Sequence, residues 1–101
     1  MEIVKEANGT ELTLKITGRI DAGTSTQLSQ EVMDSISGLT RLGFDLSGVD
    51  YISSAGLRVL IAAESSMKEQ GSMIIMGVND NLMEIFSITG FTKLMDIQPQ
   101  G

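Results

Sequence analysis

Two adjacent hydroxyls, Ser53 and Ser54, stand between a strand-like and a helix-like stretch in the segment DLSGVDYISSAGLRVL, residues 45–60. A serine at a helix start accepts a hydrogen bond from an unpaired backbone amide, which contributes about 1 kcal/mol. The same place also suits a phosphate, because free N–H groups and the positive end of the helix dipole face it. The spacing therefore leaves two roles open for these serines: a helix cap, or a hydroxyl that a kinase modifies.

The small residues after the pair, Ala55 and Gly56, would leave a hydroxyl accessible to a kinase. Phosphorylation adds a charge of about −2 at pH 7. The helix dipole offsets part of that charge within the fold, by at most about 2 kcal/mol. A partner docked on the turn would have to bury the charge unpaired, at a cost of several kcal/mol. We therefore expect a phosphate here to abolish binding while the domain stays folded, with one hydroxyl serving as cap when free and as switch when modified.

Other chemistry finds little support in the sequence. The chain has no His and no Cys, which excludes Ser-His-Asp and Cys-His catalysis, disulfides and the usual zinc sites. It has neither a GxxxxGKS/T phosphate loop nor a GxGxxG fingerprint. Asp21, Asp45 and Asp50 lie near expected strand ends and suggest a magnesium site, but their spacing does not make them converge, which favours solvated carboxylates. We predict that the protein is not an enzyme and has no metal or cofactor.

The composition restricts the partners of the chain. Its 101 residues suit one small domain, residues 1–101, with a formal net charge of −6. So acidic a surface repels phosphate backbones and anionic lipid, which argues against nucleic acid and membrane partners and favours basic protein surfaces. The N-terminus lacks the features of a signal peptide, and no apolar run approaches the roughly 20 residues that span a bilayer. We expect a cytoplasmic monomer without direct membrane insertion.

The periodicity of apolar residues predicts the elements that position the serines. Two alternating sets predict strands with one buried face: Leu12, Leu14 and Ile16, and then Leu42, Phe44 and Leu46. Residues 3–5 are expected to pair with the first of these as a hairpin, since the Asn-Gly step within residues 7–10 favours a tight reversal. The run at residues 72–76 is apolar without alternation, which is typical of a strand covered on both faces.

Apolar residues at every third or fourth position predict helices. Three are expected: from Thr24 to about Gly38, from Ser54 to Gly71, and from a cap at Asn79 or Asp80. Residues 91–97 are expected to form a short helix or an edge strand, and residues 97–101 a frayed tail. This order predicts an α/β fold: a single mixed, mainly parallel sheet of four to five strands with three to four helices packed on it.

Four segments together resemble the bacterial anti-sigma factor antagonists, the small single-domain members of the STAS (sulphate transporter and anti-sigma factor antagonist) family. In chain order they are GRID (18–21), DLSGVDYISSAGLRVL (45–60), GSMIIMGV (71–78) and FSITGFTKLMDI (86–97). The resemblance covers nearly the whole chain. It implies a STAS-like fold and a regulator of transcription rather than an enzyme.

The resemblance also implies a partner and a modification site. In the family, the unphosphorylated antagonist binds an anti-sigma factor that is also a GHKL-type serine kinase, and this releases the sigma factor. The kinase modifies the serine two residues before the glycine of the turn, which places the phosphorylation site at Ser54. The phosphorylated antagonist then dissociates from the kinase, and a serine phosphatase removes the phosphate. The implied partner-binding residues are Asp21, Thr24, Ser53, Ala55, Gly56, Leu57 and Arg58, with the acidic residue for kinase recognition at Asp21.

Two residues depart from the family pattern. Some well-known members have Asp where this chain has Ser53, and these members often have Ser or Thr where it has Ala55. Neither departure removes the Ser54 hydroxyl that would accept the phosphoryl group, but Ser53 becomes an alternative phosphorylation site. The departures leave open a relative that binds a partner without being phosphorylated, such as a regulatory subunit of a transporter or lipid-trafficking complex. Nucleotide or small-ligand binding at the sheet edge is a further alternative.

Overall fold

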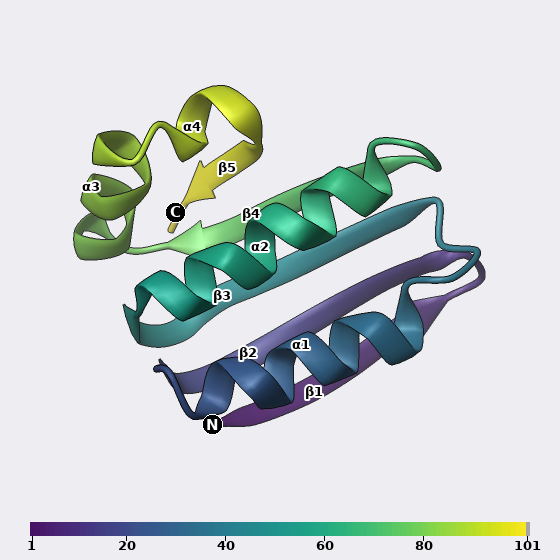
Figure 1. Cartoon of the computed structure of the whole chain (residues 1–101), viewed down its shortest axis with the longest axis horizontal. Coiled ribbons are helices and arrows are strands. Elements are labelled where there is room, and N and C mark those ends of the chain that lie inside the picture. Colours follow the sequence, from purple (N-terminus) through teal and green to yellow (C-terminus); the bar gives the residue numbers. More distant parts are fainter. Residues whose placement is uncertain (101) are drawn as a thin grey trace.

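Five strands form one sheet in the order β1-β2-β3-β4-β5 in the computed structural model, which describes residues 1–100 (Figure 1). The elements are β1 (Glu2–Asn8), β2 (Glu11–Ile20), α1 (Thr24–Ser35), β3 (Arg41–Ile52), α2 (Ser54–Met67), β4 (Ser72–Val78), α3 (Asp80–Ile88), α4 (Phe91–Leu94) and β5 (Asp96–Pro99). Only the β1–β2 pair is antiparallel, and the other three pairs are parallel. The predicted mixed, mainly parallel α/β sheet is confirmed.

The first two strands form the predicted hairpin, although β1 is longer than the three residues expected. Asn8 pairs with Glu11, so the turn consists of two residues, Gly9 and Thr10. Gly9 has a φ of +62°, a conformation that glycine adopts without steric penalty. The alternation expected in β2 is present, because its apolar positions point into the core and its polar positions do not.

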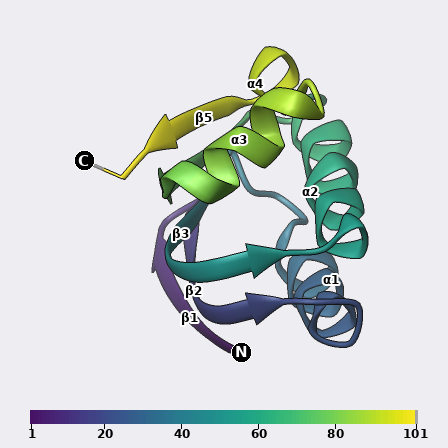
Figure 2. The same cartoon turned by 90° about the vertical axis from the view of Figure 1, so that its left-hand side faces the viewer.

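The helices α1 and α2 lie side by side on one face of the sheet (Figures 1 and 2). Beneath them, Leu14 of β2 and Phe44 and Leu46 of β3 are fully buried. The helix α1 ends at Ser35 and α2 at Met67, each a few residues before the glycine at which we expected it to stop. Within residues 1–100, no helix is both long enough and apolar enough to cross a membrane.

The prediction that β4 is covered on both faces is wrong. Met73, Ile75 and Val78 are buried under the helices, whereas Ile74 and Met76 on the other face are only half-buried. Their neighbour on β3 is Gly43, where a Cβ would lie 3.0 Å from Met76 Cε and 3.5 Å from Ile74 Cγ2. The two apolar side chains therefore fill the space over a glycine, which explains an unbroken apolar run on a sheet with one open face.

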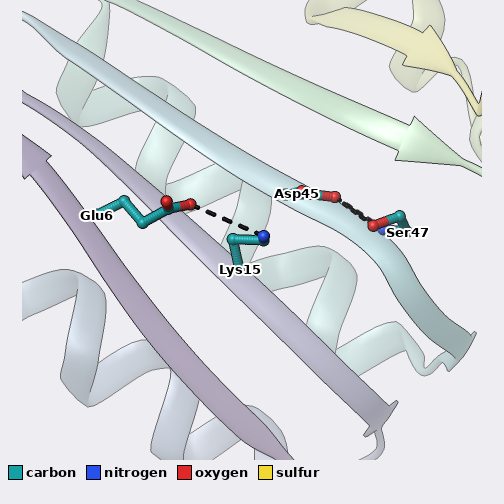
Figure 3. A network of polar contacts seen from close by, with 4 residues as sticks. All are labelled: Glu6, Lys15, Asp45 and Ser47. Atoms are coloured by element: carbon teal, nitrogen blue, oxygen red, sulfur yellow. Dashed lines mark hydrogen bonds and ion pairs between the residues drawn. The ribbon is translucent and has the colours of Figure 1, made fainter.

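The open face of the sheet carries polar groups (Figure 3). Lys15 Nζ lies 4.0 Å from Glu6 Oε1, and Asp45 Oδ1 accepts hydrogen bonds from the Ser47 amide (3.0 Å) and hydroxyl (2.7 Å). Partial burial by itself would raise the pKa of Asp45, but these two bonds and the nearby Lys15 charge outweigh it and hold the pKa below 3.8. Asp45 is thus an ionised surface carboxylate.

The C-terminal segment forms both of the elements that we expected as alternatives, the helix α4 and the edge strand β5. Asn79 caps α3 by accepting the Leu82 amide at 2.9 Å. Phe86 of α3 and Phe91 of α4 stack with ring centroids 5.7 Å apart. The frayed tail is wrong for residues 97–100, because β5 pairs with β4 and the Gln100 amide donates to Val78 O at 2.8 Å. Residue 101 lies outside the described part of the chain.

Candidate phosphorylation and partner-binding site

Two loops meet at the carboxyl edge of β2 and β3. Ile20 ends β2 and is paired in register with Ile52, which ends β3. The Ser53 amide donates to Ile20 O at 2.8 Å, so the loop after β3 is tied to the point where the loop after β2 begins. The helices α1 and α2 start at this same edge (Figure 1). The sheet therefore brings together the segments around Asp21 and Ser53, which are 32 positions apart in the chain.

Ser53 is the helix cap of α2. Its backbone is extended, with φ −88° and ψ 170°, and its Oγ accepts the Gly56 amide at 3.2 Å. This is the geometry of an N-cap residue, which is half in the helix and satisfies one of its unpaired amides. Ser54 is the first helical residue, so its own hydroxyl is not the cap. Capping therefore belongs to Ser53, and not to Ser54, the hydroxyl that the family resemblance marks for phosphorylation.

Ser54 presents a hydroxyl to solvent at the first turn of α2. The residue is exposed, whereas Ser53 is half-buried. Within residues 1–100, no side-chain hydrogen bond engages Ser54 Oγ; the hydrogen bond at this turn is the one that Ser53 accepts. Ala55 is half-buried and Arg58 is exposed one turn further on. The side chain of Ser54 therefore contributes no hydrogen bond to the start of the helix within residues 1–100.

Gly56 and Leu57 face the protein interior. Gly56 is buried, and a Cβ at this position would lie 2.6 Å from Ile20 Cγ2 and 2.8 Å from Ile52 Cγ1. The absence of a side chain therefore lets the first turn of α2 rest on the ends of β2 and β3. Leu57 is half-buried and packs against the core. Of the implied partner-binding residues, Gly56 positions the turn and is itself buried, so it offers a partner little surface.

The loop after β2 is held by a reciprocal pair of hydrogen bonds. The Thr24 amide donates to Asp21 Oδ1 and the Asp21 amide donates to Thr24 Oγ1, both at 2.9 Å. The single proton of the Thr24 hydroxyl has two acceptors within reach, Arg19 O at 2.7 Å and Asp21 Oδ1 at 3.1 Å. The Thr24 amide, followed by the Thr24 hydroxyl, holds the pKa of Asp21 below 3.8. A fixed, ionised carboxylate thus stands beside the serine turn.

The sequence analysis missed one pair beside this edge. The Arg19 guanidinium lies over the Tyr51 ring, 4.5 Å from its centroid, and Tyr51 is 40% exposed. A cation over an aromatic ring contributes about 0.5–1 kcal/mol at an exposed site. The two residues are partners in the β2–β3 register, which contains two shifts. Periodicity does not reveal such shifts, so no signal in the sequence would have paired these residues.

The carboxylates at the strand ends do not assemble into a metal site. Within residues 1–100, no group of three or more His, Cys, Asp and Glu residues is arranged to hold a metal ion. Asp21 is engaged with Thr24, Asp45 with Ser47, and Asp50 is exposed. The polar groups at this edge include a fixed carboxylate (Asp21), a capping hydroxyl (Ser53) and an exposed serine (Ser54).

Comparisons with known proteins agree with this architecture. The family model described as the STAS domain matches residues 2–100. The anti-sigma-B factor antagonist of Listeria monocytogenes is 31% identical over 98 residues, which cover 94% of this chain and 85% of that protein. An anti-sigma factor antagonist from Mycobacterium paratuberculosis has the same fold, with a TM-score of 0.89 at 21% identity, covering 97% of this chain and 85% of the other.

The cell fate determinant SpoIIAA from Bacillus, solved in its phosphorylated form, has a TM-score of 0.76 at 13% identity and covers 95% of this chain and 90% of its own. At such low identity this likeness shows the fold alone. The family follows from the match over residues 2–100 and from the Listeria relative. The chain belongs to the STAS domain family, among the relatives of the anti-sigma factor antagonists.

Proposed function

We propose that this protein is an anti-sigma factor antagonist that is switched off by phosphorylation of Ser54. Unphosphorylated, it binds an anti-sigma factor serine kinase of the GHKL type, and the sigma factor is released. The kinase transfers the γ-phosphoryl group of ATP to Ser54 Oγ; the bond to ADP breaks and the hydroxyl proton is lost. A serine phosphatase returns the hydroxyl.

The observation that carries this proposal is that the two serines differ: one caps the helix and the other is exposed. Ser53 Oγ is engaged as the cap, whereas Ser54 is exposed at the first helical position. Modification of Ser54 leaves the cap in place, and the helix dipole favours the added negative charge. The printed names of the relatives, and a structural neighbour solved in a phosphorylated form, support the same function.

The contact face in this proposal is the serine turn with the Asp21 loop beside it. Ser54 and Arg58 are exposed on α2, and Asp21 and Thr24 are half-buried on the neighbouring loop. The net charge of −6 favours a basic partner surface. Where no cation of the partner faces Ser54, burial of a phosphate in the interface costs several kcal/mol, which exceeds what the helix dipole offsets.

Binding measurements with the cognate kinase test the switch. Calorimetry should give tight binding for the wild type and for Ser54→Ala, and an affinity lower by on the order of 100-fold for the Ser54 phosphoprotein. The matched control is Ser65→Asp, which adds a negative charge at an exposed serine further along α2 and should bind as the wild type does. Equal affinities of the phosphorylated and unphosphorylated proteins would contradict the mechanism, as would co-purification with a membrane ATPase in place of the kinase.

A further inference from the structure

We infer that Arg58 is the internal counter-ion of a phosphate on Ser54. The inference rests on the proposed function for the identity of the modified serine. It adds that the phosphate forms an intramolecular ion pair with Arg58, whose exposed guanidinium is then no longer free to contact the partner. Phosphorylation would then change the docking surface twice, by adding an anion and by engaging the Arg58 guanidinium.

Helix geometry places the two side chains together. Ser54 and Arg58 are four residues apart within α2, a separation that puts their Cβ atoms about 5–6 Å from each other on one helix face. Both residues are exposed, so neither has to leave the core to reach the other. The anion stands on the N-terminal side of the cation, which is the favourable order along a helix because it agrees with the dipole.

Arg58 is unengaged in the unphosphorylated protein. Within residues 1–100, the ion pairs are Lys5 with Glu31 and Lys15 with Glu6, and neither uses Arg58. The positions one turn away from Arg58 on α2 are occupied by Ser54, Ala55, Ile61 and Ala62, none of which is a carboxylate. Ser54 is therefore the position near Arg58 at which a modification can create an anion.

The chemistry suits the pair. A phosphoserine carries about −1.5 to −2 charges at pH 7 and three strong acceptor oxygens. The planar guanidinium can donate two parallel N–H bonds to two of those oxygens, which an ammonium group cannot do in the same geometry. The phosphate of Ser54 would thus lie at the positive end of the α2 dipole, with Arg58 as its counter-ion.

The test uses protein in which phosphoserine is installed at position 54 during translation, so it needs no kinase. The second ionisation of the phosphate, ordinarily near pH 6, is followed by phosphorus NMR. The pKa of the phosphate should be about 0.3 lower in the wild type than in Arg58→Gln. Arg58→Lys should keep most of the lowering because it keeps the charge, and 1 M salt should shrink it.

Arg41→Gln is the matched control, since it removes the same charge from the opposite end of β3. It should titrate as the wild type does. The inference is overturned if wild type and Arg58→Gln share one phosphate pKa, or if Arg41→Gln raises it equally. These outcomes do not decide the proposed function. The proposed function fails if the kinase leaves Ser54 unmodified, even where the installed phosphate titrates as expected.

Discussion

Ser53 Oγ accepts the amide hydrogen of Gly56 at 3.2 Å, and this single bond assigns the helix cap to the first of two adjacent serines. Ser54, the next residue, is exposed as the first residue of α2. A serine that caps the helix and an exposed serine therefore stand side by side at the edge where β2 and β3 end.

Removal of the cap should destabilise the fold more than removal of the exposed hydroxyl. Ser53→Ala leaves the Gly56 amide without its partner and should lower the free energy of unfolding by about 1 kcal/mol. Ser54→Ala is the matched control and should change it by less than about 0.5 kcal/mol, as expected of a surface substitution. Urea unfolding at 25 °C measures both. A larger loss in Ser54→Ala would mean that the caps have been assigned to the wrong residue.

Gly56→Ala should destabilise the protein although alanine is the better helix former. The added methyl would lie 2.6 Å from Ile20 Cγ2 and 2.8 Å from Ile52 Cγ1. Overpacking of this kind costs about 1–3 kcal/mol, which outweighs the helix-propensity gain of about 1 kcal/mol. Thermal unfolding followed by circular dichroism measures the loss.

Gly23→Ala is the control for that substitution. Gly23 has an ordinary φ of −74°, and its nearest contact for a Cβ is Asp21 Oδ1 at 3.5 Å. This variant should be as stable as the wild type or slightly more stable, because alanine restricts the unfolded chain. If both glycine variants unfold at the wild-type temperature, the first turn of α2 is not packed against β2 and β3 as described.

The Asp21 carboxylate should contribute stability that depends on pH. The Thr24 amide and hydroxyl lower the pKa of Asp21 below its ordinary value of 3.8. A lowered carboxyl pKa stabilises the fold above the unfolded-state value, and this contribution is lost as the pH falls through the folded-state value. The stability difference between wild type and Asp21→Asn should therefore be full at pH 6 and decline below about pH 4.

Thr24→Val tests whether the Thr24 hydroxyl lowers the pKa of Asp21, as distinct from other effects of acid on stability. It removes the hydroxyl bonds and keeps the backbone amide, so the pKa of Asp21 should rise part of the way toward 3.8. Carbon-detected NMR titration of the Asp21 carboxyl group in both proteins gives the comparison. An unchanged pKa in Thr24→Val would show that the hydroxyl does not hold the carboxylate.

Local patterns predicted the strands β2 and β3 and the helices α1, α2 and α3, because each of these elements buries one face. The alternation of Leu12, Leu14 and Ile16 identified β2 as a strand with one buried face, and Leu28 and Val32 of α1 are buried as their spacing requires. The β4 prediction failed because Ile74 and Met76 on its second face lie over Gly43 of the neighbouring strand and are not covered by a helix. Such a relationship depends on register, which a single strand does not encode.

The sequence predicted that the serine pair lies at the start of a helix, but it did not show which serine is the cap. The hydroxyls, the small residues after them and Asp21 were identified from residue types and from the family resemblance. Which serine caps α2 depends on the extended backbone of Ser53, and both serines are chemically able to cap. The Arg19–Tyr51 contact depends on two register shifts between β2 and β3. Spacing along the chain carries neither piece of information.

The most direct test of the central claim is to map phosphate by mass spectrometry after incubation with the cognate kinase and ATP. The wild type and Ser53→Ala should each carry one phosphate, on Ser54, and Ser54→Ala should carry none. Phosphate on Ser53, or on any residue of Ser54→Ala at the wild-type level, would contradict the account.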